Sequence, residues 1–585
     1  MVWLRRILLD GAVPLAILAG ISIAIMGDGW TRMHSVVIGG GNPTTPSDVN
    51  GTLWFYWWVS TALERGADIL QPDVICAPDG QSLGSNFPQQ IDALMATPFL
   101  RLFPFPASFN AFVALIPVLG GLAAYAGSRW LGIGRGLSLM TAVLFGFNSL
   151  SLHELANGKP PSALVFTLPL FVCAWVKCLT ATGRATIGWV IAAGLATALA
   201  IQHYVLYALV AAFFAAGTLV LFSLKPAPRV GRSRALVAGL AVVLIGVAVS
   251  APYLQRLLGE RRPMPAAMAP RITDPSVLRE QKESSHVGYI LTADMDEETP
   301  RRAVFPAVLT VTSLLLLPVG GRRHRRWLIA AAGFYILSLG PMAATSVRPE
   351  VEWLTIAGRG VPLPTWWLNQ AFPFSIQFFH PGRVVPMVVL CASISVATGL
   401  QHWAKGRVWA RWLPVVAVLI AGLGMAQLHA QGGTRILMSD WDPHPFLTEL
   451  ASDPDGGAII EFPVGLGHAT AAEQLIHGRK RSESHHDAIA ALKEDQRPED
   501  CLQSSIFDAL WPLSQGDLTQ LPTNAHLSAA RADGFSHLVL WRSGFDVLNQ
   551  AGIEADRERT IRALRRTLGS PVASDETLVA WELKP

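Results

Sequence analysis

The feature that most constrains this chain is a series of apolar stretches, each about as long as a membrane-spanning helix. A helix needs about 20 mostly apolar residues to cross a bilayer. Lipid also requires that each span satisfy its own backbone hydrogen bonds, which a helix does. We predict a mainly α, polytopic membrane helix bundle with eleven spans: Ile7–Met26, Ala107–Ala126, Leu137–Leu152, Pro161–Cys178, Ile187–Gln202, Val205–Leu224, Ala235–Tyr253, Ala303–Val319, Trp327–Ala344, Val384–Leu400 and Leu413–Leu428.

Charge divides the chain into two parts. Of its 585 residues, 51% are hydrophobic and 15% charged, against about 25% charged in ordinary soluble proteins. Residues 431–585 hold 23 acidic and 14 basic residues, whereas residues 1–430 hold 19 and 32. We therefore predict a transmembrane domain at 1–430, with a large first outer loop at 27–106, and a small soluble α/β domain at 431–585.

The basic residues predict the orientation. With the N-terminus in the cytoplasm, the N-terminal segment and the inner loops hold seventeen Lys and Arg residues and one acidic residue, Asp10. Positive charge marks the cytoplasmic side of a membrane protein. An odd number of spans then places 431–585 outside, so we predict a multi-pass protein of the inner (plasma) membrane with a periplasmic or extracellular C-terminal domain.

The predicted C-terminal domain contains three strand patterns, Ala458–Val464, His537–Trp541 and Thr577–Glu582. Helical spacing marks Ala471–His477, Ala488–Glu494, Ile506–Trp511 and Arg557–Leu568, the last ending at Gly569 and Pro571. The domain has no dinucleotide or P-loop motif, and no nucleic-acid partner is expected. His485, His486 and Asp487 are interpreted as a solvated turn rather than a metal site.

Five cysteines are too few, and too widely spaced, for a metal motif. Cys173, Cys178 and Cys391 fall in apolar spans and are expected to be inert thiols. Cys76 and Cys501 share the outer compartment. A disulfide between them is one alternative, but two separate thiols are the expectation.

The first outer loop holds the main catalytic candidate, Asp48. It directly precedes Thr52–Arg65, a segment with apolar residues and tryptophans at helical spacing. We predict a helix lying in the membrane interface, where Trp and Tyr are favoured, and a second one at Pro88–Phe103 with Asp92 on its polar face. A carboxylate at this boundary can deprotonate a hydroxyl or hold a divalent metal against a phosphate. The alternative is that Asp48 only caps the helix.

A second polar group follows the third predicted span. His153, Glu154 and Lys159 lie near membrane depth, where polar residues are functional candidates. Glu154 is a candidate second carboxylate, and Lys159 a phosphate ligand. The alternative is a local Glu154–Lys159 ion pair. His203 and Tyr204 form a tight outer turn, which favours a structural role for that histidine.

Arginines at the outer boundary are candidates for holding a lipid phosphate, which Arg binds through two parallel hydrogen bonds. The candidates are Arg256, Arg359 and Arg383, with His380 one helical turn before Arg383. Their alternative role is contact with lipid headgroups. For Arg383 the functional interpretation is favoured.

These motifs together resemble the GT-C superfamily of polyprenyl-phosphate-dependent glycosyltransferases, and large bacterial membrane proteins of that layout. The resemblance covers most of the chain through short motifs: Asp48-Val49-Asn50 after the first span, the Trp54–Trp58 helix, Ala77-Pro78-Asp79-Gly80, Ser149–Lys159, His380-Pro381-Gly382-Arg383 and the α/β tail.

The resemblance implies a membrane glycosyltransferase that moves a sugar from a polyprenyl-phosphate-linked donor to an acceptor glycan or lipid on the outer face of the membrane. The first-loop aspartate of the family acts as base or metal partner, and that role falls on Asp48. Asn50 replaces the second carboxylate of a DxD motif, which leaves dependence on a divalent metal such as Mg or Mn open. The implied substrate-binding residues are Asn50, Trp54, His153, Lys159, Arg256, His380 and Arg383, with Glu154 as a second catalytic carboxylate.

Two other classes of function stay open. A lipid or solute transporter or flippase would place charges or broken helices at the membrane midplane, often in repeated halves. The predicted spans hold few internal charges, and Pro117 with Gly120 and Gly121 is the clearest break, in one span only. A non-catalytic membrane scaffold that binds a partner through its tail is the third class.

Overall fold

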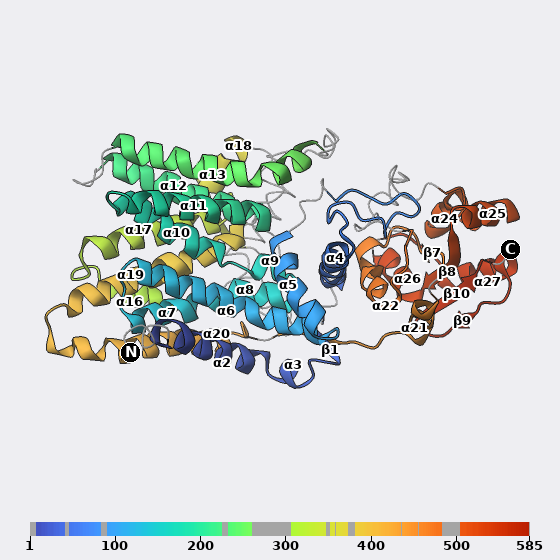
Figure 1. The fold of residues 1–585 in the computed structure, drawn as a ribbon, viewed down its shortest axis with the longest axis horizontal. Coiled ribbons are helices and arrows are strands. Elements are labelled where there is room, and N and C mark those ends of the chain that lie inside the picture. The colour runs from blue at the N-terminus through green and yellow to red at the C-terminus, as the bar shows by residue number, and fades with distance from the viewer. Residues whose placement is uncertain are drawn as a thin grey trace. The chain divides into compact units, whose positions relative to one another are not determined.

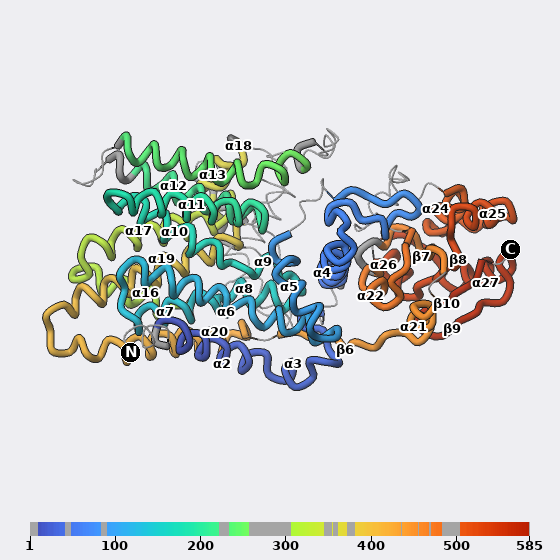
Figure 2. The backbone as a smooth tube through the Cα atoms, in the orientation of Figure 1, coloured from blue at the N-terminus to red at the C-terminus, as the bar shows by residue number. Residues whose placement is uncertain are grey.

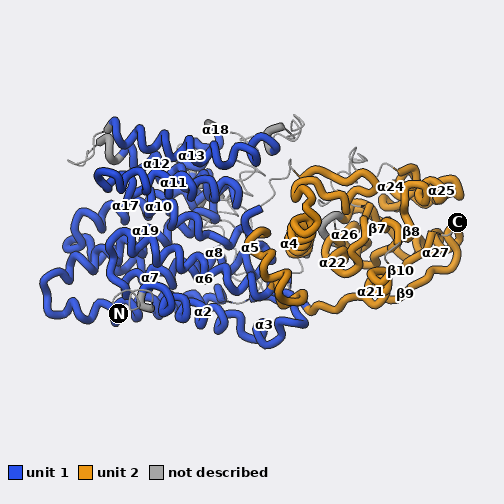
Figure 3. The backbone as a smooth tube through the Cα atoms, viewed as in Figure 1, with its two compact units in different colours: residues 1–42, 89–92, 110–439 blue, residues 43–88, 93–109, 440–585 orange. Residues whose placement is uncertain are grey.

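The computed structural model describes residues 8–40, 46–83, 90–224, 232–259, 306–346, 352–356, 359–371, 381–434, 436–453, 456–482, 504–550 and 552–583. The chain forms two compact units (Figure 3). The first comprises Met1–Asn42, Gln89–Asp92 and Asn110–Ser439, and the second Pro43–Pro88, Ala93–Phe109 and Asp440–Pro585. Each unit therefore combines segments that are distant in the sequence.

The first unit is a helix bundle (Figure 1). Its longer helices are α2 (Val13–Met26), α6 (Ala107–Trp130), α7 (Arg135–Gly146), α8 (Ser149–Ala156), α10 (Thr167–Thr180), α11 (Ala185–His203), α12 (Val205–Leu224), α13 (Arg232–Gly259), α16 (Ala307–Leu315), α17 (Gly321–Ser338), α18 (Pro364–Ala371), α19 (Val385–Ala404) and α20 (Leu413–Ala430). The short elements are the π-helix η1 (Leu8–Ala12), α3 (Asp28–Thr31), α9 (Pro160–Ala163), and the 3-10 turns η4 (Pro381–Val384) and η5 (Val408–Trp412).

Within the bundle α19 is the central helix. It contacts α7 and α17, which come from different parts of the chain (Figure 2). In Pro381–Ala404, which includes α19, 94% of the most apolar 18-residue stretch is buried. In Val408–Ala430, which includes α20, the corresponding share is 22%. A helix that is apolar all round is either buried in protein or faces lipid. The outer helices therefore expose the apolar surface that a bilayer would cover.

The predicted mainly helical membrane bundle is confirmed, with seven helices in the described residues long and apolar enough to span a membrane. Asp10–Met26 and Val205–Val220 are shorter apolar helices. The span predicted at Trp327–Ala344 corresponds to α17, which begins earlier, at Gly321, and ends at Ser338. Its first turns carry four arginines. The total of eleven spans stays a prediction.

Three small two-stranded sheets belong wholly or mainly to the first unit. One pairs β1 (Val36–Ile38) with β6 (Met438–Asp440). The others pair β2 (Ala344–Ser346) with β3 (Glu352–Trp353) and β4 (Thr355–Ile356) with β5 (Arg359–Gly360).

The second unit contains a four-stranded sheet in the order β7-β8-β10-β9. Its strands are β7 (Ala458–Phe462), β8 (Phe535–Trp541), β9 (Ala573–Ser574) and β10 (Leu578–Glu582). β7 is parallel to β8, and β10 is antiparallel to both β8 and β9. All three predicted strands are present and apolar, so the sheet forms part of a buried core.

Helices of this unit are α4 (Pro46–Arg65), α5 (Gln90–Leu102, whose first turn belongs to the first unit), α21 (Pro445–Ser452), the 3-10 segment η6 (Gly467–Glu473), α22 (Gln474–His477), α24 (Phe507–Ser514), α25 (Asn524–Ala532), α26 (Arg542–Gln550) and α27 (Arg557–Leu568). The bounds predicted for α27 are confirmed, and Gly569 caps it. The predicted helix at Ala488–Glu494 lies outside the described residues.

The first-loop helix α4 buries most of its aromatic side chains in protein. Trp54, Tyr56 and Trp58 are each less than 2% exposed, and α4 packs against η6. Cys76 and Ala77, from the same loop, belong to one hydrophobic core with β7, β8 and β10. The interfacial interpretation is wrong for these aromatic residues because protein atoms cover them.

Cys76 corrects a second expectation. It is disulfide-bonded, whereas a separate thiol was expected, and its suggested partner Cys501 lies outside the described residues. Cys173, Cys178 and Cys391 are free and buried, as predicted.

Candidate functional site

Glu154 is held by a short helix that is buried along its whole length. The side chain of Asn148 accepts a hydrogen bond from the backbone N–H of Ser151 at 3.1 Å and so caps the start of α8. This cap satisfies one of the free N–H groups of the first turn. At the other end, the backbone N–H of Lys159 donates to the Glu154 carbonyl at 2.8 Å. The local sequence therefore fixes Glu154, which is 1% exposed.

Arg383 contacts Glu154 from a distant part of the chain. Its Nη2 lies 3.8 Å from Glu154 Oε2, and its Nη1 donates a hydrogen bond to the Tyr204 hydroxyl. The guanidinium also lies over the Tyr204 ring, 5.4 Å from its centre, an attractive cation–π geometry. Glu154, Tyr204 and Arg383 thus form one cluster, which we call the Glu–Tyr–Arg cluster, at the ends of apolar helices.

Three further residues extend this cluster. The Tyr207 ring lies 5.1 Å from that of Tyr204, and its hydroxyl donates to the Ser162 carbonyl. Next to it, His203 Nε2 donates to the Leu164 carbonyl at 2.8 Å, which fixes a proton on that nitrogen. His203 Nδ1 lies 4.0 Å from Asp92 Oδ1, and neither side chain is exposed.

The sequence placed Asp92 on the polar face of a helix and gave His203 a structural role in a tight turn. The structure has that turn between α11 and α12, but it buries both side chains and brings them together. A buried Asp beside a buried His was not predictable, because residues 92 and 203 come from separate helices.

The remaining predicted residues of the first unit do not all join the Glu–Tyr–Arg cluster. His153 is 2% exposed, and its Nε2 accepts a hydrogen bond from the Asn157 amide at 3.0 Å within α8. Lys159 is half-buried at the start of α9, and Arg256 is exposed in the last turn of α13. His380 lies outside the described residues. The structure therefore brings Glu154 and Arg383 together among the predicted site residues of this unit.

Asp48 and Asn50 belong to the second unit; Asp48 is in the first turn of α4, and Asn50 directly follows that turn. Both are half-buried. The helix begins at Pro46, so Asp48 is its third residue rather than its cap, and its carbonyl accepts a hydrogen bond from Thr52 Oγ1 at 2.9 Å. The first turn of a helix favours a negative charge. This electrostatic effect is therefore one structural explanation for Asp48.

Trp54 is fully buried, and its indole N–H donates to Gln474 Oε1 at 2.5 Å. This contact joins the first loop to the C-terminal region of the chain. Trp54 therefore has a structural partner within the second unit.

A buried charged cluster that the sequence did not reveal lies near this contact. Arg481 Nη2 is 2.6 Å from Glu461 Oε2 and 2.9 Å from Thr470 Oγ1, and both charged residues are 1% exposed. Burial raises the pKa of Glu461, against the opposing effect of Arg481. Burial also raises the pKa of Glu473 to about 7, and the charge of Glu461 adds to the increase. Loss of hydration disfavours the charged form of an acid.

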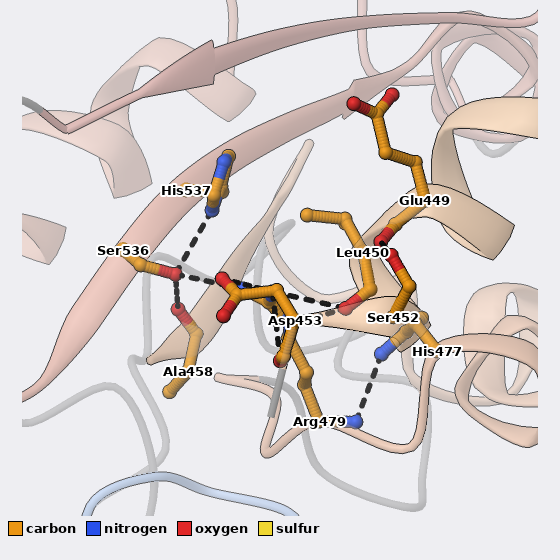
Figure 4. Close-up of polar contacts among 9 residues, drawn as sticks. All are labelled: Glu449, Leu450, Ser452, Asp453, Ala458, His477, Arg479, Ser536 and His537. Carbon is orange, nitrogen blue, oxygen red and sulfur yellow. Dashed lines mark hydrogen bonds and ion pairs between the residues drawn. The ribbon is translucent and has the colours of Figure 1, made fainter. Parts of the chain in front are cut away.

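A second polar cluster lies at the C-terminal end of α21 (Figure 4). Arg479 Nη2 donates to the Leu450 carbonyl at 2.9 Å and lies 3.0 Å from Asp453 Oδ2. Its Nη1 donates to Ser536 Oγ at 3.2 Å, next to His537. A cation here satisfies a terminal carbonyl of the helix. This structural role accounts for the Arg479 cluster, and we assign it no part in the candidate site.

No group of three or more His, Cys, Asp or Glu side chains that could hold a metal ion occurs in the described residues. A metal at Asp48 stays a hypothesis.

The fold is similar to several solved membrane glycosyltransferases. Arabinofuranosyltransferase AftD from Mycobacteria matches at 15% identity and a TM-score of 0.48, over 98% of this chain and 41% of AftD. The apo oligosaccharyltransferase of Archaeoglobus fulgidus matches at 12% identity and 0.49, over 96% and 73%. ArnT from Cupriavidus metallidurans, bound to undecaprenyl phosphate, matches at 13% identity and 0.47, over 97% and 98%.

This chain thus spans less than half the length of AftD. No family model matches the sequence, and no curated protein matches it. At these identities and TM-scores the likeness assigns no function to this chain.

Proposed function

We propose that this chain is a membrane glycosyltransferase that transfers a sugar from a polyprenyl-phosphate-linked donor to an acceptor glycan or lipid. The observation that carries the proposal is the Glu–Tyr–Arg cluster. Its arginine is held by a carboxylate and a tyrosine at the ends of apolar helices. A guanidinium fixed in this way is suited to a phosphate.

The proposal gives each candidate residue a role. Arg383 binds the donor phosphate, and Glu154 orients the guanidinium. Asp48 takes the proton from the acceptor hydroxyl or holds a divalent metal. The other predicted ligands of the donor or acceptor are Asn50, His153, Lys159, Arg256 and His380.

We also propose that the first loop and the C-terminal region lie outside the cytoplasm. The disulfide at Cys76 supports this placement, because disulfides persist in oxidising compartments such as the periplasm. The excess of basic residues in the predicted inner loops supports the same orientation. The protein would then act on the outer face of the plasma membrane.

The test is a transfer assay in nanodiscs with radiolabelled polyprenyl-phosphate sugars and a cell-envelope extract as acceptor. Asp48→Asn removes the base and should lower product formation by roughly a hundredfold or more. Glu64→Gln is the matched control, because Glu64 is an exposed carboxylate on the same helix. Arg383→Lys keeps the positive charge but loses the paired N–H groups of the guanidinium. It should therefore raise KM for the labelled polyprenyl-phosphate sugar.

Full activity of the Asp48→Asn protein would remove Asp48 as base. Movement of labelled lipid or solute across sealed vesicles, without a new covalent product, would contradict the transferase proposal and favour transport. Neither product nor movement with any of the labelled donors would favour a scaffold.

A further inference from the structure

Gln474 connects three segments of the second unit. Its Oε1 accepts the indole N–H of Trp54 at 2.5 Å. Its Nε2 donates to the carbonyls of Val74 at 2.7 Å and Arg479 at 2.6 Å. Trp54 and Gln474 are both 0% exposed. Both N–H groups of the amide and one acceptor site of its oxygen are therefore used in a buried site, and each lost hydrogen bond would leave a buried group unsatisfied.

Backbone contacts continue this connection. The Ala77 N–H donates to the Arg481 carbonyl at 2.9 Å, and the Arg481 N–H donates to the Val74 carbonyl at 3.0 Å. Lys480 Nζ lies 3.7 Å from Asp73 Oδ2. The first loop is thus attached to this segment at Gln474 and again at Lys480 and Arg481.

The attachment constrains how α4 is rotated about its axis. Trp54 lies six residues after Asp48, which in a helix is about 9 Å along the axis and roughly 120° around it. A side chain hydrogen-bonded in a buried site cannot turn without breaking that bond. A fixed Trp54 therefore sets the direction in which the first turn, with Asp48, projects.

We propose that Gln474 and Trp54 are positioning residues for the transfer reaction: their hydrogen bond sets the rotation of α4 and thereby the orientation of Asp48. This inference rests on the proposed function, in which Asp48 is the base or metal partner. Neither residue touches substrate in this scheme. In particular, Trp54 acts through the helix and not as a sugar-binding surface.

The test compares two tryptophans on the same helix. Trp54→Phe removes the N–H that reaches Gln474 and keeps most of the aromatic volume. Trp58→Phe is the matched control, because Trp58 is also 0% exposed and its N–H donates at 3.0 Å to the Ile69 carbonyl, within the first loop itself. Gln474→Met removes the amide at similar volume.

Trp54→Phe and Gln474→Met should lower kcat roughly ten- to a hundredfold, as expected when a reacting group is misplaced by about 1 Å. KM for the labelled polyprenyl-phosphate sugar should stay unchanged, and Trp58→Phe should lose much less activity. The double variant should be no worse than the poorer single variant, because both break the same hydrogen bond.

Hydrogen–deuterium exchange of the full chain in nanodiscs gives a readout independent of activity. Amides in the first two turns of α4 should exchange faster in Trp54→Phe than in Trp58→Phe. Equal exchange and equal activity in these two variants would overturn the positioning role. If Asp48→Asn is fully active, the role of Asp48 as base or metal partner fails instead, whatever the exchange shows. Strictly additive kcat losses in the double variant would also contradict the inference.

Discussion

Glu473 provides the sharpest test of the electrostatics of the second unit. It ends η6, directly before Gln474, with its Oε2 buried. Its pKa is raised from 4.5 to about 7, first by burial and then by Glu461, while Arg481 lowers it. We predict that Glu473→Gln stabilises the protein at neutral and alkaline pH, because it removes the cost of burying the charge.

The sign follows from proton binding. The folded carboxyl keeps its proton up to about pH 7, whereas the unfolded one loses it near pH 4.5. Unfolding therefore releases a proton between these values, so stability falls as pH rises through this window. A pKa difference of about 2.5 corresponds to roughly 3 kcal/mol at pH 8. For a unit of this size that is an upper limit of about 6–12 °C in melting temperature.

The assay is thermal unfolding of the full chain in detergent, followed by tryptophan fluorescence from pH 4.5 to 8. The native protein and Glu473→Gln should melt together near pH 4.5 and diverge as pH rises, with the variant more stable. Glu449→Gln, an exposed change on α21, should follow the native curve. A variant that is equally or less stable than the native protein at pH 8 would refute the reasoning.

Three other changes test the remaining contacts. Arg481→Met should destabilise the protein by about 3–5 kcal/mol, because it leaves Glu461 buried without its cation; adding Glu461→Leu should recover much of the loss in thermal unfolding. Gly39→Ala should cost about 1–3 kcal/mol, since φ is +88° and a Cβ there would lie 2.5 Å from the Leu155 carbonyl oxygen; an unchanged melting temperature would contradict this. Glu154→Gln should raise KM for the labelled donor roughly tenfold at unchanged expression, and an unchanged KM would show that Glu154 does not orient Arg383.

The candidate site was predictable in part. Glu154 and Arg383 were found because each is a charge at the end of an apolar segment, and such charges are rare enough to be noticed from sequence. Asp92 and His203 were not paired, because nothing in either local pattern indicates the other. Cys76 was expected as a thiol for the same reason, since sequence spacing does not reveal which groups meet.

The sequence by itself determined the membrane bundle. The length and hydropathy of each apolar segment are local properties, and lipid allows few other structures for them. Strand patterns such as the one that becomes β8 were also local and were found. Only the tertiary structure decided that α4 belongs to the second unit and that protein, not lipid, covers Trp54. The contact responsible, Trp54 with Gln474, joins residues 420 positions apart. An aromatic helix has the same pattern whether lipid or protein covers it, so only its packing partner distinguishes the two.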